Sequence, residues 1–209
     1  MDRAVAEVPS FAGVVPASGA SRRMGRAKAT LPLQGRSFLE RVTTSLRDGG
    51  CDPVFVVFDP TDATVAAEVA RLAADGSIDP VENPEPGEGP ITSLRLALPR
   101  VPDDRDGVAW LPLDYPLVDA EAVARLVEAA QRSNADLTLP LHEGKRGHPA
   151  LFRRALFDEL ADPSLEGGAR IVVHRHLERA CLVPFEESGV VIDVDTPEAY
   201  AAVREEVTA

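Results

Sequence analysis

Short runs of apolar, often β-branched residues alternate along the chain with stretches whose apolar residues recur at helical spacing. Turn residues bound most of these runs, as is typical of buried strands of a few residues. The runs expected to form strands or short extended segments are 11–15, 53–58, 78–81, 107–111, 136–140, 150–152, 180–184 and 190–194.

The stretches between the runs carry helix start and stop signals. An oxygen-bearing side chain at a helix start accepts a backbone N–H of the first turn, and glycine often follows the last turn. The first expected helix is capped by Ser37 together with Glu40 and ends at Gly49–Gly50, and the second is capped by Thr61 and ends at Asp75–Gly76. Asp119 is expected to cap a further helix, and Thr196–Pro197 to begin the last one. The remaining expected helices cover 92–98, 154–160 and 168–176.

This alternation predicts an α/β fold with a mostly parallel sheet covered on both faces, because parallel strands need crossover connections. No internal repeat, low-complexity run or linker divides the sequence, so residues 1–209 are expected to form one domain. Ligands of such sheets bind beyond the carboxyl ends of the strands, where the strand order reverses. The segments after the strands at 11–15, 78–81 and 107–111 are therefore expected to converge on one cleft.

The composition is that of an acidic soluble protein. Its 22 Lys and Arg residues stand against 34 Asp and Glu, for a net charge of −12. This balance argues against nucleic acid as a partner, since nucleic-acid binding needs a broad basic face. No stretch reads as a membrane span or signal peptide, and Cys51 and Cys181 lack metal-ligand spacing. We therefore expect a cytoplasmic protein that has no membrane partner.

A local positive island interrupts this acidic chain between residues 16 and 28. No Asp or Glu occurs from Val8 to Leu39, whereas the cations of this stretch are Arg22, Arg23, Arg26, Lys28 and Arg36. Small residues at 17–21 let backbone N–H groups turn toward an anion. The island therefore favours a phosphate site for a nucleotide, and a solvated basic turn is the alternative.

The spacing in the island excludes the two common phosphate-loop fingerprints. Gly19 and Gly25 do not give the dinucleotide-binding pattern, and Lys28 is neither preceded by glycine nor followed by Ser or Thr as in a Walker A loop. A fixed cation near an α-phosphorus still neutralises charge as a pentavalent transition state develops.

Carboxylates at two expected strand ends are candidate ligands for Mg²⁺, which accepts one or two carboxylates plus substrate phosphates. Asp114 follows the run at 107–111, and Asp193 and Asp195 lie at the end of the run at 190–194. Residues two apart in an extended segment point to the same side, so either of the pair can join Asp114 around one ion. The alternatives are a turn role for Asp114 and a helix cap for Asp195.

A second basic, glycine-hinged loop lies at Lys145–Pro149. Within it, His148 is either a substrate contact or a turn residue.

Together these features resemble the MobA/MocA-like nucleotidyltransferases, the molybdenum cofactor guanylyl- and cytidylyltransferase family. The opening motif of that family is Leu-Ala-Ala-Gly-x-Ser-x-Arg-Met-Gly-x-x-Lys, and the stretch from Pro16 to Lys28, PASGASRRMGRAK, matches it in register. Further matching patches follow in order: Asn83–Pro84 leading to Gly89 and Ser93–Leu94, then Asp114–Tyr115–Pro116, Gly147–His148–Pro149 and Asp193–Val194–Asp195–Thr196–Pro197.

The resemblance implies a three-layer α/β/α sandwich with a mixed, mostly parallel sheet. It also implies Mg²⁺-dependent transfer of NMP from an NTP to a phosphorylated acceptor such as molybdopterin, with release of pyrophosphate. The residues that it implies for the nucleotide are Ala17, Ser18, Gly19, Ala20, Ser21, Asn83 and Ser93. It further implies Arg23 and Lys28 as catalytic cations on the triphosphate, Asp114 with Asp193 or Asp195 as metal ligands, and Gly147 and His148 beside the acceptor.

Two departures from the family pattern shape the expected substrates. Pro16 stands where the family commonly has Leu and resembles the pyrimidine-using relatives, which favours CTP over GTP. A Gly-Asp-x-Gly-Ala-Arg patch on the acceptor side appears here as residues 165–170, LEGGAR, without its Asp. The alternatives are a sugar-phosphate nucleotidyltransferase and an accessory protein that binds a nucleotide or cofactor without turnover.

Overall fold

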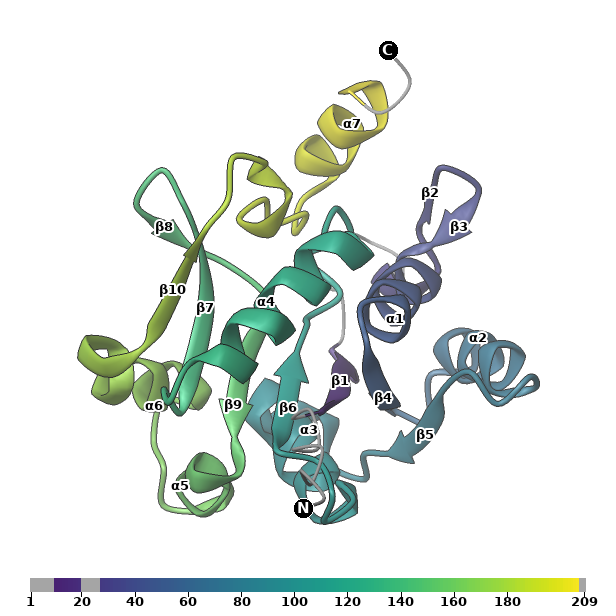
Figure 1. Cartoon of the computed structure of the whole chain (residues 1–209). Helices are drawn as coiled ribbons and strands as arrows, with labels where there is room; N and C mark the ends of the chain where they lie inside the picture. Colours follow the sequence, from purple (N-terminus) through teal and green to yellow (C-terminus); the bar gives the residue numbers. More distant parts are fainter. Residues whose placement is uncertain (1–9, 20–26, 207–209) are drawn as a thin grey trace, which may run out of the picture.

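The computed structural model describes residues 10–19 and 27–206, which form an eight-stranded sheet with helices on both faces (Figure 1). The strand order is β5–β4–β1–β6–β9–β7–β10, and β8 pairs with β7. The strands of this sheet are β1 (Phe11–Ala17), β4 (Cys51–Phe58), β5 (Asp79–Glu82), β6 (Gly107–Trp110), β7 (Leu137–His142), β8 (Lys145–Arg146), β9 (Ala150–Arg153) and β10 (Cys181–Pro184). A separate short hairpin joins β2 (Pro32–Leu33) to β3 (Arg36–Ser37).

Helices cover the sheet from both sides. On one face α1, α2 and α4 contact the strands, and on the other α3 packs on β1 and β4 and is followed by α5 and α6. The helices are α1 (Phe38–Asp48), α2 (Ala63–Ala73), α3 (Pro90–Ala97), α4 (Ala120–Arg132), α5 (Phe157–Ala161), α6 (Ala169–His176) and α7 (Pro197–Glu206). The α/β/α expectation is confirmed.

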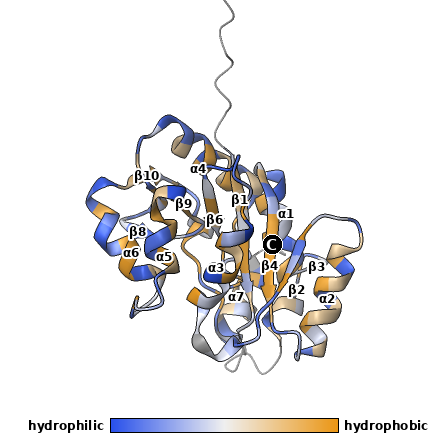
Figure 2. Ribbon diagram, turned by 90° about the horizontal axis from the view of Figure 1, so that it is seen from below, coloured by the Kyte–Doolittle hydropathy of each residue, from blue (hydrophilic) through white to orange (hydrophobic). Residues whose placement is uncertain are grey.

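Strand β1 shows why the sheet needs both helical layers. Its side chains alternate, so that Phe11, Val15 and Ala17 enter one apolar core while Ala12 and Val14 enter the other. A strand that is apolar on both sides is stable only when both faces are covered. Figure 2 shows the apolar residues concentrated in these central strands.

The sheet is mixed because β9 runs antiparallel to both neighbours, β6 and β7. The pairs β1–β4, β1–β6, β4–β5 and β7–β10 are parallel. The chain reverses in the β7–β8 hairpin and continues in that direction into β9, which inserts between β6 and β7. The short extended segment expected at 150–152 is therefore a central strand.

Most expected helix caps are present. The Ser37 and Asp119 side chains accept the backbone N–H groups of Glu40 and Ala122 at 3.0 and 2.8 Å. The expected cap at Thr61 is wrong, because Asp62 accepts the N–H groups of the first turn of α2. Thr61 instead donates its hydroxyl to Asp59 at 2.6 Å. A carboxylate one residue closer to the helix takes the capping position.

The strand expected at 190–194 is also wrong. Residues Ser188–Val190 form a single 3₁₀ turn, and no strand follows before α7. Val190 and Val194 are nevertheless buried, Val194 among Leu31, Phe38 and Val203. The apolar run therefore reflects burial against other segments rather than pairing in a sheet.

No helix in the described part of the chain is long and apolar enough to cross a membrane.

Candidate active site

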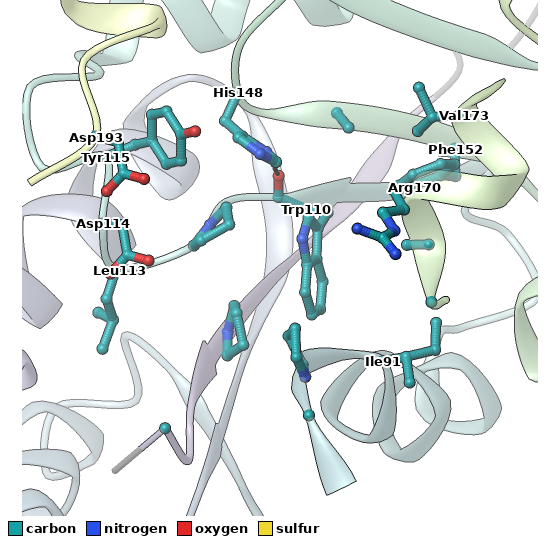
Figure 3. Close-up of a pocket in the computed structure, with 18 of the residues that line it drawn as sticks. Ile91, Trp110, Leu113, Asp114, Tyr115, His148, Phe152, Arg170, Val173 and Asp193 are labelled. Atoms are coloured by element: carbon teal, nitrogen blue, oxygen red, sulfur yellow. Dashed lines mark hydrogen bonds between the residues drawn. The ribbon is translucent and has the colours of Figure 1, made fainter. Parts of the chain in front are cut away.

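A cleft of about 1410 Å³ opens beside the carboxyl ends of β1 and β6 (Figure 3). Strands β4 and β5 lie on one side of β1, whereas β6 and the remaining strands lie on the other. This is the position where the strand order reverses, and open α/β sheets bind their ligands there. The segments after β1 and β6 converge on the cleft, as the sequence predicts.

Lys28 connects two of the predicted metal ligands. Its Nζ donates to Oδ1 of Asp114 and, at 2.7 Å, to Oδ1 of Asp195. Only 6% of Lys28 is exposed. Burial lowers the pKa of Lys28, but hydrogen bonds and charges from Asp114 and Asp195 outweigh it and hold the pKa above its ordinary value. Lys28 is therefore a fixed ammonium at neutral pH.

These three residues come from distant parts of the chain. Lys28 begins a 3₁₀ turn, Asp114 follows β6, and Asp195 lies two residues before α7. The Val194 N–H donates to the Asp114 carbonyl at 2.7 Å, which joins the last two segments directly. The fold therefore brings together a cation and two carboxylates that the sequence separates widely.

Asp193 faces the same cleft beside Tyr115. Burial raises the pKa of the Tyr115 hydroxyl to about 12, and the charges of Asp193 and Asp114 add to this. Over residues 10–19 and 27–206, no three His, Cys, Asp or Glu side chains form a group that could hold a metal. Two convergent carboxylates nevertheless suffice for Mg²⁺ when substrate phosphates complete its shell, so the residues present fit such an ion.

Ser18, Asn83 and Ser93 form a buried hydrogen-bonded group. The Ser18 and Ser93 hydroxyls are 2.9 Å apart, and Asn83 Nδ2 donates to Ser18 Oγ at 3.2 Å. Asn83 and Ser93 are fully buried. Ser18 and Gly19 line the cleft, whereas Ala17, Asn83 and Ser93 are not among its lining residues. Asn83 and Ser93 thus contact the cleft lining only through Ser18.

The predictions for Ala20, Ser21 and Arg23 lie outside the described residues.

Gly147 and His148 line the cleft, and Figure 3 shows His148 between Tyr115 and Trp110. A Cβ on Gly147 would lie 1.8 Å from the Val190 carbonyl oxygen, so this position needs glycine. The His148 N–H donates to that same oxygen at 2.8 Å, and the His148 ring lies 4.4 Å from the Tyr115 ring. Burial lowers the pKa of His148 to about 4, so the ring is neutral at pH 7.

Sequence reasoning missed the apolar floor of the cleft. Trp110, Leu139 and Phe152 line it from β6, β7 and β9, and Arg170 reaches it from α6. The apolar pattern of the sequence predicts these residues as core. That they also line a cleft follows only from the pairing of β6, β7 and β9 in the sheet. For Arg170 the sequence offered one indication, because the patch at 165–170 resembles a family motif on the acceptor side.

The chain is similar in sequence to a known family of proteins. The model of the MobA-like NTP transferase domain matches residues 13–180. A probable molybdenum cofactor guanylyltransferase of Mycobacterium avium is 32% identical over 79% of this chain and 80% of its own length. The molybdenum cofactor cytidylyltransferase of Escherichia coli is 25% identical over 93% and 96%. A nicotine blue oxidoreductase of Paenarthrobacter nicotinovorans is 27% identical over 92% and 95%.

Solved structures agree over nearly the whole chain. The Rv0371c protein of Mycobacterium tuberculosis is 28% identical, with a TM-score of 0.78 over 94% of this chain and 98% of that one. Its complex with manganese gives a TM-score of 0.74 over the same shares, at 26% identity. The chain therefore belongs to the MobA-like NTP transferase domain family and is a nucleotidyltransferase of the molybdenum cofactor guanylyl- and cytidylyltransferase type.

Proposed function

We propose that this chain transfers a nucleoside monophosphate from an NTP to a phosphorylated acceptor of the molybdopterin type and releases pyrophosphate. The observation that carries the proposal is the convergence of Lys28, Asp114 and Asp195 at the carboxyl ends of the sheet, at one end of a cleft that also holds Arg170. The named relatives include guanylyl- and cytidylyltransferases of the molybdenum cofactor. Because another relative is named as an oxidoreductase, the choice of nucleotide and acceptor is argued from the site geometry and the family motif.

Each site residue has a distinct task in this proposal. Ser18 and Gly19 line the cleft directly after β1 and present their segment to the nucleotide. Asn83 and Ser93 position that segment through Ser18. The Lys28 ammonium faces the triphosphate and offsets the negative charge that grows at the α-phosphorus when the acceptor phosphate attacks in line. Arg23, Ala20 and Ser21 are assigned to the triphosphate and nucleotide by the family motif.

Asp114, with Asp193 or Asp195, would hold Mg²⁺. The bound ion would supply charge neutralisation and orientation of the phosphates. The manganese complex of the Mycobacterium tuberculosis relative supports a divalent cation in this fold. Asp195 is the stronger second ligand candidate, because it shares the Lys28 ammonium with Asp114.

CTP is the nucleotide favoured by Pro16, which lines the cleft at the first motif position. Gly147 and His148 would border the acceptor, because they lie between the carboxylates and the apolar floor. The neutral His148 ring packs against the Tyr115 ring at this position.

Pyrophosphate release tests the proposal. The full chain with Mg²⁺ is incubated with CTP, GTP, ATP or UTP, each with molybdopterin or with a hexose phosphate as acceptor. We expect release with CTP and molybdopterin, and a loss of at least about a hundredfold in both Lys28→Ala and Asp114→Ala. Arg132→Ala and Asp48→Ala are the matched controls, since both residues are exposed and neither lines the cleft.

Near-wild-type release in either site variant would contradict the mechanism. Nucleotide binding by calorimetry without pyrophosphate from any acceptor would favour the accessory-protein alternative. Release with a hexose phosphate but not with molybdopterin would favour the sugar-phosphate alternative.

A further inference from the structure

The stretch that carries Asp114, residues 111–119, has little structure of its own and is here called the Asp114 segment. It joins β6 to α4 and forms neither strand nor helix. Its internal backbone hydrogen bonds are two turn bonds, from the Tyr115 N–H to the Pro112 carbonyl at 3.2 Å and from the Val118 N–H to the Tyr115 carbonyl at 3.3 Å. Its two prolines have no N–H to donate. The position of Asp114 therefore depends on contacts with other parts of the chain.

Helix α1 supplies two of these contacts through its side chains. Arg41 Nε donates to the Pro116 carbonyl at 2.9 Å, and the buried Ser45 hydroxyl donates to the Val118 carbonyl at 2.7 Å. Arg41 and Ser45 are four residues apart on the helix, so their side chains leave from the same face. One face of α1 therefore holds the chain at points two and four residues after Asp114.

Arg41 is a half-buried cation whose acceptors are neutral. Besides the Pro116 carbonyl, its guanidinium donates to Gln34 Oε1 in the β2–β3 turn at 2.8 Å. The adjacent carboxylate, Glu40, pairs with Arg71 at 2.6 Å, and within the described part of the chain no carboxylate forms an ion pair with Arg41. Burial lowers the pKa of Arg41. A buried cation needs well-formed hydrogen bonds to offset its lost hydration, so these two acceptors fix the guanidinium in place.

The Asp114 segment also contacts the stretch that leads to Asp195. The Asp114 carbonyl accepts the Val194 N–H at 2.7 Å. A Cβ on Gly189 would lie 2.9 Å from the Leu117 carbonyl oxygen, so the two backbones are in close contact there. The segment thus uses one set of carbonyls toward α1 and another toward the stretch before Asp195. A shift of the segment relative to α1 would change how the Asp114 and Asp195 carboxylates face each other.

We propose that Arg41 and Ser45 are positioning residues for Asp114. By holding carbonyls of the Asp114 segment, they keep its carboxylate where it converges with that of Asp195, as a shared divalent ion requires. Groups that orient metal ligands without contacting the metal contribute to affinity and activity in this way. This inference rests on the proposed function, since it concerns the carboxylates assigned to the metal of that reaction.

Titration of the full chain with Mn²⁺ alone, followed by electron paramagnetic resonance, tests the inference without turnover. Arg41→Met should weaken Mn²⁺ binding about tenfold, and Ser45→Ala about threefold. Arg41→Lys keeps a cationic donor for the Pro116 carbonyl and should stay within about threefold of wild type.

Nucleotide binding separates positioning of Asp114 from general loosening of the site. CTP binding measured by calorimetry without metal should change less than about twofold in all three variants, because Ser18 and Gly19 have no hydrogen bond to Arg41 or Ser45. In the pyrophosphate assay kcat should fall about tenfold in Arg41→Met, with KM for CTP unchanged.

Two controls separate positioning from lost charge and from lost stability. Arg47→Met removes an exposed cation from the same helix, where it pairs with Asp48 at 3.1 Å, and should bind Mn²⁺ as wild type does. Val101→Ala removes buried packing before the amino end of β6, away from the cleft lining. It should lower the melting temperature through lost packing and leave Mn²⁺ binding unchanged. Thermal melting shows which variants fold.

Wild-type Mn²⁺ affinity in folded Arg41→Met would overturn the inference, as would an equal loss of affinity in Val101→Ala. If Arg41→Met does not fold, wild-type affinity in Ser45→Ala overturns it instead. The proposed function fails separately. Mn²⁺ binding that weakens as expected, without pyrophosphate from any NTP and acceptor in wild type, would remove only the transfer reaction. Pyrophosphate release by wild type, with kcat and Mn²⁺ affinity unchanged in Arg41→Met, would remove only the positioning role.

Discussion

The Lys28 ammonium is held by carboxylates from two segments that follow it far along the chain. Asp114 and Asp195 each accept a hydrogen bond from its Nζ. Two carboxylates this close together repel each other unless a cation lies between them. In this structure the cation between the carboxylates is the Lys28 ammonium. In the proposed reaction a divalent ion bound with substrate phosphates would also supply positive charge to them. The same electrostatics therefore explain the local structure and the proposed chemistry.

Substitutions of Asp193 and Asp195 are expected to have different effects. Asp195→Asn removes one of the two charges that converge on Lys28, so we expect pyrophosphate release to fall about a hundredfold and Mn²⁺ binding to weaken in parallel. Asp193→Asn should cost less than about tenfold, because Asp193 lies beside Tyr115. Steady-state rates and Mn²⁺ titration by electron paramagnetic resonance measure both effects. A larger loss in Asp193→Asn than in Asp195→Asn would reverse the assignment of the second ligand.

His148 makes stability depend on pH. Its pKa falls from 6.5 to about 4 on folding because the ring is buried. The unfolded chain therefore binds the proton first, and stability that is complete above pH 6.5 declines as the pH falls toward 4. The full decline is about 3 kcal/mol. Urea unfolding between pH 7 and pH 4 measures it, and His148→Gln should flatten the difference. Parallel curves for the variant and wild type would contradict this origin.

At the scale of elements, Ser18 after β1 is held by one residue that follows β5 and by one residue of α3. Asn83 follows β5, and Ser93 lies in α3. Both contact Ser18, and Asn83 Oδ1 also accepts the Glu85 N–H at 2.9 Å. Buried polar side chains of this kind cost stability when a partner is removed. The arrangement therefore fixes Ser18, directly after β1, to two neighbouring elements.

Asn83→Ala should destabilise the fold by about 1–3 kcal/mol, since it leaves buried polar groups without a partner. It should also raise the Kd for the nucleotide severalfold, because the loop beginning at Ser18 loses its support. Urea unfolding and nucleotide calorimetry give the two values. Asn134→Ala, at an exposed position, is the control and should change neither. A stability loss without any change in nucleotide binding would contradict the positioning role.

At the scale of the whole molecule, α7 connects the carboxylate end of the cleft, at Asp195, to the β2–β3 hairpin. Leu31, Leu33, Phe38, Val194 and Val203 form a third apolar cluster, and the Tyr200 hydroxyl donates to the Pro32 carbonyl at 2.6 Å. Figure 1 shows α7 and this hairpin at the same edge of the molecule. Asp195 lies two residues before α7 and so depends on this packing.

Val203→Ala should destabilise the fold by about 2 kcal/mol through lost packing. We expect pyrophosphate release to fall several-fold even at a temperature where the variant is fully folded, because the segment carrying Asp195 loosens. Thermal melting and rates at low temperature separate the two effects. Ala202→Ser, at an exposed position of the same helix, should leave both unchanged. An unchanged rate in folded Val203→Ala would show that α7 does not position Asp195.

Local patterns were enough to predict most strands and helices and the caps at Ser37 and Asp119, because these depend on neighbours within a few residues. The motif from Pro16 to Lys28 was enough for the family. The expectations at Thr61 and at 190–194 failed because a nearby Asp competed for one cap, and because a buried apolar run need not pair in a sheet.

By itself, the sequence determined the α/β class, the position of the cleft at the strand ends and the family, since periodicity, turn residues and a long motif are local. Only the tertiary structure decided that β9 inserts antiparallel beside β6, that Asn83 and Ser93 contact Ser18, and that Trp110 lines the cleft. These features depend on which distant segments become neighbours. Strand pairing and burial set that choice over the whole chain, and no short window of residues encodes it.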